Sequence, residues 1–164
     1  MERRFYHTGK TGEILGLSPR KVSMLFDEGI LKGVKMPFTE RTEGKRRVSE
    51  DSILDLLARS GYEFKFQTFE HKSSKDMDVV MPEGFLSVGK VAEIIHVANR
   101  TVINYLNRGV FNGYVLKSNN PDYNLHKICK RSLAEYLQTS GMLQFINPEL
   151  LKKYNLPLEA KAAA

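Results

Sequence analysis

The chain has little cysteine and no long apolar run. Its single cysteine, Cys129, excludes a framework of internal disulfide bonds. No stretch approaches the ~20 apolar residues that a helix needs to cross a bilayer, and the first residues lack the apolar core of a secretion signal. These absences predict a soluble, cytoplasmic protein.

Patterns typical of catalytic and metal sites are also missing. The acidic residues on predicted helix faces that point to solvent are Glu13, Asp55, Glu93 and Glu135. Solvated carboxylates are seldom general acids, so we predict no enzymatic activity. His126 and Cys129 are close enough in sequence to share a zinc ion, but zinc needs two further ligands and the other histidines are scattered. We expect no metal and no other cofactor.

Negative charge is in short supply. The chain has 25 Lys and Arg against 19 Asp and Glu, which gives a formal net charge of +6. Residues 1–64 hold 12 basic and 10 acidic residues, or +2, whereas residues 85–146 hold 7 and 3, or +4. A basic balance favours a polyanionic partner such as nucleic acid, although a solvated basic surface is the alternative. The second half is the better electrostatic candidate.

The chain repeats itself at a spacing of 80 residues. Identical pairs at this spacing are Phe5/Phe85, Gly9/Gly89, Lys10/Lys90, Glu13/Glu93, Ile14/Ile94, Arg20/Arg100, Val22/Val102, Gly29/Gly109, Gly33/Gly113, Ser52/Ser132, Leu57/Leu137, Ser60/Ser140 and Gly61/Gly141. Chance rarely keeps one register without a gap over such a length, so the pattern indicates two copies of one small domain.

The clearest local pattern lies in the second copy, over residues 87–114, which read SVGKVAEIIHVANRTVINYLNRGVFNGY. Its apolar residues fall at helical spacing on both sides of a tight turn, at Val91, Ala92, Ile94 and Ile95 and then at Val102, Tyr105 and Leu106. This is a helix-turn-helix pattern. The outer face of its second helix carries amide, hydroxyl and guanidinium groups, which form hydrogen bonds to base edges in a major groove.

Capping signals predict the helices of the first copy. Thr8 is expected to cap a helix over 8–15. Ser18 is expected to cap the next helix, with Pro19 at its first position and Gly29 at its end. Several local signals agree, so a second helix-turn-helix is predicted here.

The rest of the first copy has the pattern of a β-wing and a third helix. Residues 30–38 are predicted as a strand, 39–45 as a polar loop and 46–49 as a returning strand. Ser49 is expected to begin a further helix with an apolar side. Gly12, matched by an alanine in the second copy, meets the need for a small residue where two helices cross closely. The predicted fold class is therefore α+β, mainly α with small β wings, in two tandem winged helix-turn-helix domains.

These residues resemble the winged helix-turn-helix domains of the MerR and excisionase type. The resemblance covers 5–61 and 85–141, through GKTGEILGLSPRKVSMLFDEGIL with GKRRVSEDSILDLL, and GKVAEIIHVANRTVINYLNRGVF with HKICKRSLAEYL. It implies that the second helix enters the major groove and that the wing tracks the DNA backbone or the minor groove. The second copy departs from the pattern at 124–127, where its wing is less basic.

The resemblance and the polar second helices together give a set of expected DNA-contacting residues. They are Arg20, Lys21, Ser23, Arg41, Lys45, Arg46 and Arg47 in the first copy, and Asn99, Arg100, Thr101, Asn104 and Lys127 in the second. For Arg20 and Arg100 the alternative is a surface arginine that pairs with a carboxylate. For the wing cations the alternative is a solvated surface. Lys10 and Lys90 could contact phosphate or remain idle surface charges.

The predicted organisation is two domains, at 1–64 and 85–146, joined by an aromatic and polar segment over 65–84. Residues 62–69, YEFKFQTF, alternate aromatic with polar residues, which predicts a strand that packs on a domain or that mediates self-association. Residues 70–78 resemble a flexible linker. A short helix from Asn147 and a tail are expected within 147–164.

We therefore expect a sequence-specific double-stranded DNA-binding protein, a bacterial or phage transcription regulator associated with the nucleoid. One alternative is an excisionase-like architectural factor that bends DNA for recombination or packaging. Another is a protein-interaction adaptor that has lost DNA binding. Because neither copy extends into a long coiled coil or an effector domain, no small-molecule effector is expected.

Overall fold

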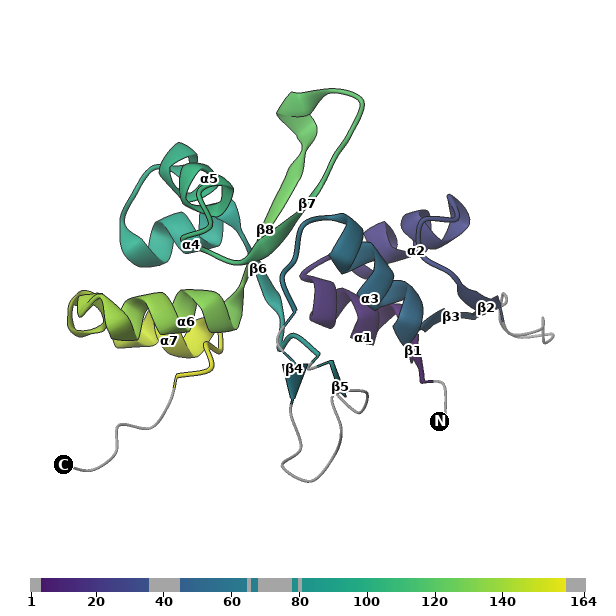
Figure 1. Cartoon of the computed structure of the whole chain (residues 1–164), viewed down its shortest axis with the longest axis horizontal. Helices are drawn as coiled ribbons and strands as arrows, with labels where there is room; N and C mark the ends of the chain where they lie inside the picture. The colour runs from purple at the N-terminus through teal and green to yellow at the C-terminus, as the bar shows by residue number, and fades with distance from the viewer. Residues whose placement is uncertain (1–3, 36–44, 65, 68–77, 80, 159–164) are drawn as a thin grey trace. The chain divides into compact units, whose positions relative to one another are not determined.

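The computed structural model describes residues 4–35, 45–64, 66–67, 78–79 and 81–158, and it divides the chain into two compact units (Figure 1). The first unit is Met1–Met81 and the second is Pro82–Ala164, so the division falls inside the segment expected to join the two copies. Each unit combines helices with a small antiparallel sheet, in agreement with the α+β class. Within the described residues, no helix has both the length and the apolar character that crossing a membrane requires.

The first unit contains a sheet whose strands lie in the order β1-β3-β2. Its elements, in chain order, are β1 (Phe5–His7), α1 (Thr8–Leu15), α2 (Pro19–Asp27), β2 (Gly33–Lys35), β3 (Arg46–Ser49) and α3 (Glu50–Arg59), followed by β4 (Phe66–Gln67) and β5 (Asp78–Val79). Strand β3 lies in the centre and pairs antiparallel with both neighbours.

The second unit has the same order of elements through its third helix, apart from the added η2, and its sheet runs β6-β8-β7. These elements are β6 (Phe85–Ser87), α4 (Val88–Ile95), α5 (Asn99–Asn107), β7 (Gly113–Leu116), η2 (Pro121–Tyr123), β8 (Leu125–Cys129) and α6 (Lys130–Thr139), followed by η3 (Met142–Phe145) and α7 (Pro148–Lys153). Helices α1, α2 and α3 reappear 80 residues later as α4, α5 and α6 with matching bounds, so the repeat found in the sequence is a repeat of structure.

The helix starts follow the capping signals with one exception. Ser18 caps α2, where its Oγ accepts a hydrogen bond from the backbone N–H of Lys21 at 3.2 Å. The prediction that Thr8 caps α1 is wrong, because Thr8 is the first residue of the helix and His7 is the cap. The His7 ring supplies the acceptor, with Nδ1 3.0 Å from the Lys10 backbone nitrogen. An imidazole nitrogen thus accepts the capping hydrogen bond in place of the expected hydroxyl oxygen.

The first two helices of each unit pack closely across their turn, as the small residue at position 12 predicts. A Cβ atom added at Gly12 would collide with the backbone carbonyl of Leu17. The turn needs a left-handed backbone at the end of the first helix, where Gly16 has φ 71° and the second unit uses His96 with φ 56°. Glycine takes this conformation without strain, whereas histidine does so at a cost.

The strand predicted over 30–38 is shorter at its start. Strand β2 begins at Gly33, because the backbone N–H groups of Ile30 and Leu31 donate to the carbonyl of Leu25 and so close the end of α2 instead of pairing in the sheet. The returning strand over 46–49 has its predicted bounds. Of the loop expected over 39–45, residues 39–44, which include Arg41, lie outside the described part of the chain.

Each unit has its own apolar core under its sheet. The first is built from residues such as Leu15, Val22, Leu31, Val48, Ile53 and Leu57. The second is built around Val91, Ile94, Val102, Phe111, Ile128 and Leu133, and it also takes in Ile146 and Leu156 from the C-terminal extension. That extension contains the predicted short helix, α7, whose cap Asn147 accepts a hydrogen bond from the Glu149 N–H at 3.0 Å.

Within the aromatic segment 62–69, residues Phe66–Gln67 form strand β4. Tyr62 is buried and its ring packs edge-to-face on Phe64 with centroids 4.9 Å apart, outside any strand. The strand prediction is therefore wrong for 62–64. Strand β4 pairs with β5 of the same unit. Most of the predicted linker, 70–78, lies outside the described residues.

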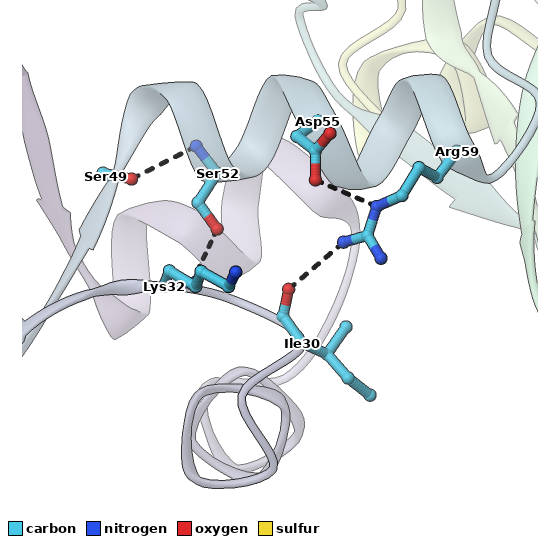
Figure 2. Close-up of polar contacts among 6 residues, drawn as sticks. All are labelled: Ile30, Lys32, Ser49, Ser52, Asp55 and Arg59. Carbon is cyan, nitrogen blue, oxygen red and sulfur yellow. Dashed lines mark hydrogen bonds and ion pairs between the residues drawn. The ribbon is translucent and has the colours of Figure 1, made fainter.

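A serine of the third helix holds that helix against the connection between α2 and β2 (Figure 2). The Ser52 hydroxyl accepts a hydrogen bond from the Lys32 backbone N–H at 2.6 Å. In the second unit the Asn112 backbone N–H donates to the Ser132 hydroxyl at 2.8 Å. The contact explains why serine occupies both positions of this pair.

We expect Ser52→Ala and Ser132→Ala each to lower the free energy of unfolding by about 1–2 kcal/mol, because a backbone N–H loses its acceptor. Urea unfolding followed by circular dichroism measures the change. Ser23→Ala is the matched control, since the Ser23 hydroxyl, on helix α2, has no hydrogen-bond partner within the described residues. An effect of Ser52→Ala no larger than that of the control would contradict the role given to this contact.

Candidate nucleic-acid interface

The second helix of the second unit, α5, presents a polar face without a carboxylate. Its exposed residues are Asn99, Arg100, Asn104 and Asn107, followed by Arg108 at its C-cap. Val102 is fully buried and fixes which side of the helix points inward. Thr101 is half-buried. The exposed side of α5 therefore offers amide and guanidinium groups, which donate and accept hydrogen bonds in planar pairs.

The matching helix α2 has a mixed face. Arg20 is exposed near its start, with Lys21 and Ser23 half-buried beside it, while Asp27 and Glu28 are exposed at its end. Negative charge at this end lowers the attraction of α2 for a polyanion relative to α5. The two helices thus share a fold position and differ in charge.

The matched arginines Arg20 and Arg100 are not held by carboxylates of the described residues. Both lie at the second position of their helices and both are exposed. The described residues therefore do not show the alternative, in which each surface arginine pairs with a neighbouring acid. No carboxylate of the described residues therefore blocks their guanidinium groups from an external ligand.

Arg46 is engaged, which sequence reasoning missed. Its guanidinium forms a two-pronged pair with Asp27 at the end of α2, with Nε 2.9 Å from Oδ1 and Nη2 2.8 Å from Oδ2. The hydrogen bond from Arg46 lowers the pKa of the Asp27 carboxyl. In the second unit these positions are Asn107 and His126, so the acid and the arginine are replaced together. That joint change between the copies is the signal that could have predicted the pair.

The other expected residues of the β2–β3 region are less constrained. Arg47 follows Arg46 on the opposite face of β3, and its Nη1 donates to the Arg46 carbonyl at 3.3 Å. Lys45 is exposed. Arg41 lies outside the described residues. In the described part of this region, Lys45 and Arg47 are therefore better candidates than Arg46 for contact with an external ligand.

In the second unit Lys127 lies in the central strand β8, where it pairs in register with Ser87 and with Tyr114. Burial, and then the nearby charge of Lys90, lower the pKa of Lys127. The same two causes lower the pKa of Lys130 at the start of α6. The residue pattern predicts Lys127 as a DNA contact and does not predict Lys130, because the start of a helix carries no signal for such a contact.

The β7–β8 tip is tied by its own hydrogen bonds. The Ser118 N–H donates to Asn124 Oδ1 at 2.8 Å, and the Ser118 hydroxyl donates to the Asn120 carbonyl at 2.6 Å. Tyr123 is 73% exposed on this tip. Sequence reasoning missed the tyrosine, because a single aromatic in a polar loop gives no periodic signal.

Carboxylates elsewhere form local surface contacts. Glu13 Oε2 lies 3.6 Å from Lys10 Nζ, and Asp55 Oδ2 lies 2.9 Å from Arg59 Nε. Cys129 is buried, and the described residues contain no group of three His, Cys, Asp or Glu side chains that could hold a metal ion.

No protein-family model, curated protein or solved structure matches this chain. What the chain does is therefore inferred from its own residues.

The Asp27–Arg46 pair leads to a prediction about the pKa of Asp27 and about how the stability of the chain depends on pH. We expect the Asp27 carboxyl to titrate below its ordinary value of 3.8 in the native chain and to move back toward that value in Arg46→Gln. Because the pKa of Asp27 is lower in the folded chain than its ordinary value, this pair stabilises the fold fully at pH values above 3.8. The stabilisation is lost as the pH falls through the lowered pKa. Carboxyl-carbon NMR titration measures the shift.

Arg47→Gln is the control for this titration, since it removes the same charge one residue away and leaves the Asp27 pair intact. An equal movement of the Asp27 pKa in both variants would mean that general electrostatics, and not the two-pronged hydrogen bond, causes the shift.

Proposed function

We propose that this chain binds double-stranded DNA through two tandem winged helix-turn-helix units of the MerR and excisionase type, and that it acts as a transcription regulator. In each unit the second helix (α2 or α5) is assigned to the major groove, and the β2–β3 or β7–β8 region is the wing. The repeated order of elements and the basic balance of the chain support this assignment.

The observation that carries the proposal is the matched pair Arg20 and Arg100. Both are exposed at the same position of the second helix, and neither has a carboxylate partner within the described residues. An arginine in a major groove donates two hydrogen bonds to the edge of a guanine. Beside Arg100, the exposed amides of Asn99 and Asn104 suit the edge of an adenine.

The phosphate contacts of the two wings are assigned differently. Because Arg46 already pairs with Asp27, Lys45 and Arg47 are the first candidates in the first unit. In the second unit the candidate on the wing strand is Lys127. Such contacts add affinity and position the helix without reading sequence.

We expect Arg100→Ala and Arg20→Ala each to weaken specific binding by about 1–3 kcal/mol and to relax the preference at one base position, because a guanine-reading guanidinium is lost. The target comes from selecting bound sites out of random duplex DNA, and fluorescence anisotropy on that site measures the affinity. Arg59→Ala is the matched control, because it removes the same charge from α3, where Arg59 pairs with Asp55.

Equal losses on every sequence would mean that the two arginines touch only phosphate. Binding that shows no selected sequence and disappears at moderate salt would favour the architectural alternative. No binding at any salt would reject DNA as the partner and leave the adaptor alternative.

The presence of two units predicts avidity. We expect Arg20→Ala with Lys21→Ala, or Arg100→Ala with Asn104→Ala, to shorten the footprint to one half-site and to weaken binding by about 10²-fold, because a tethered second unit acts at an effective concentration that can reach millimolar. The two half-sites should differ in sequence, since PRK of the first unit stands where the second has NRT. Footprinting of the whole chain and of both double variants measures this.

A double variant whose footprint and affinity equal those of the unmodified chain would show that its unit does not contact DNA. In that case the tandem mode of binding would be wrong, even if the other unit binds.

A further inference from the structure

The second helix of the first unit, α2, carries an acid on the same face as Arg20. Asp27 is the last residue of α2 and follows Arg20 by seven residues, which is close to two helical turns. Both side chains are exposed, and their positions are about 10 Å apart along the helix axis. A carboxylate at this place repels a phosphate backbone. Asp27 therefore opposes the DNA contact assigned to its own helix.

Arg46 neutralises this carboxylate from the neighbouring strand β3. Its Nε lies 2.9 Å from Asp27 Oδ1 and its Nη2 lies 2.8 Å from Oδ2. The two side chains are 26% and 53% exposed, for Arg46 and Asp27 respectively. The pair is open to solvent, so an external anion can reach the same guanidinium group. A phosphate suits it, because phosphate and carboxylate both accept two parallel hydrogen bonds from arginine.

Other cations surround Arg46 on the wing. Lys35 lies opposite Arg46 in the register of β2 with β3, and Lys45 precedes Arg46 in the chain. Opposite residues of an antiparallel pair point to one face of the sheet, where like charges repel. The hydrogen bond from Arg46 lowers the pKa of Asp27 most, and the charge of Lys35 lowers it further. Asp27 is therefore an ionised acid within a positively charged part of the wing.

The second unit shows that the fold does not require these charges. The positions of Asp27, Lys35 and Arg46 are occupied there by Asn107, Val115 and His126. Helix α5 nevertheless keeps the matching bounds, and β7 pairs with β8 in the matching register. Exposed ion pairs contribute little to stability, and an acid at the end of a helix is unfavourable. The ion pair is therefore a property of the first unit and not of the fold.

We propose that Asp27 competes with a DNA phosphate for Arg46 and so lowers the affinity of the first unit for DNA. This inference rests on the function proposed above. While the pair is closed, Arg46 makes no contact with the DNA backbone. When a phosphate displaces the carboxylate, Asp27 is left beside a polyanion, and the resulting repulsion opposes the exchange. The first unit thus makes one phosphate contact fewer than its wing cations allow.

The test compares the full chain with Asp27→Asn, which removes the charge, keeps the side-chain size and supplies the residue of the second unit. We expect the affinity for duplex DNA to rise about 5- to 10-fold at low salt, and the salt dependence to steepen by about one unit, because one phosphate contact is gained. Fluorescence anisotropy at several salt concentrations, on the site selected for the unmodified chain, measures both.

The matched control is Glu28→Gln. Glu28 is the exposed C-cap residue of α2 and forms no ion pair within the described part of the chain. Its removal takes away the same charge one residue further on and leaves the Asp27 pair intact. We expect the salt slope of Glu28→Gln to equal that of the unmodified chain. A slope that steepens equally in both variants would overturn the proposal.

A double-variant cycle tests whether Asp27 acts through Arg46. In an Arg46→Gln background, Asp27→Asn should leave the salt slope unchanged and should raise the affinity much less, because no guanidinium is released. An equal gain in both backgrounds would mean that the carboxylate acts by general repulsion, and the competition would be rejected. Weaker binding by Asp27→Asn would mean that the closed pair positions the wing for DNA, which also overturns the proposal.

Two further readings separate this inference from folding and from the proposed function. Thermal unfolding followed by circular dichroism should give nearly the same melting temperature for Asp27→Asn and the unmodified chain, because the pair is exposed. DNA binding that depends on Arg100 but has the same salt slope in Asp27→Asn would overturn the competition and leave the proposed function in place. Absence of DNA binding by the unmodified chain and by every variant would reject both.

Discussion

The close packing of the first two helices determines what each unit can present to a partner. Gly12 lets α1 lie close against the turn at Leu17, whose carbonyl a Cβ atom at position 12 would meet, and the left-handed residue after the first helix sets that turn. Val22 and Val102 then anchor the second helix by complete burial. With one side fixed inward, the opposite side must face solvent. The exposure of Arg20 and Arg100 is thus a consequence of packing, and any contact they make with DNA depends on it.

Most of the helices could be predicted from sequence because their signals are local. The cap Ser18, the first-turn Pro19 and the left-handed Gly29 act within one or two turns of the chain, and they place α2 within its observed bounds. Features that depend on distant residues could not be predicted in the same way. The Asp27–Arg46 pair joins positions 19 residues apart, and its formation depends on how β3 lies beside α2. Local signals also fail where another side chain does the same work, as His7 does for the expected Thr8 cap.

Comparison of the two units shows how one fold carries two charge distributions. The Asp27–Arg46 pair becomes Asn107 and His126, and Glu50 becomes Lys130. None of these positions belongs to the buried core, so the changes leave the packing intact. Substitutions outside the core usually alter stability little, and charge is therefore free to change. The first unit thus has an ion pair between Asp27 and Arg46, whereas the second unit has an amide and an imidazole at these two positions.

The C-terminal extension contributes to this difference although it lies outside the repeat. Ile146 and Leu156 join the apolar core of the second unit, which fixes α7 against it. Tyr154 is then held where its hydroxyl donates to Glu93. In the first unit the matching acid, Glu13, pairs with Lys10, so an acid that neutralises a lysine in one copy is bound by a tyrosine in the other. Lys90 loses its intrahelical partner as a direct result. The apolar contacts that hold the extension in place therefore also affect the charge of the surface beside it, and the folded second unit includes this extension as well as α6.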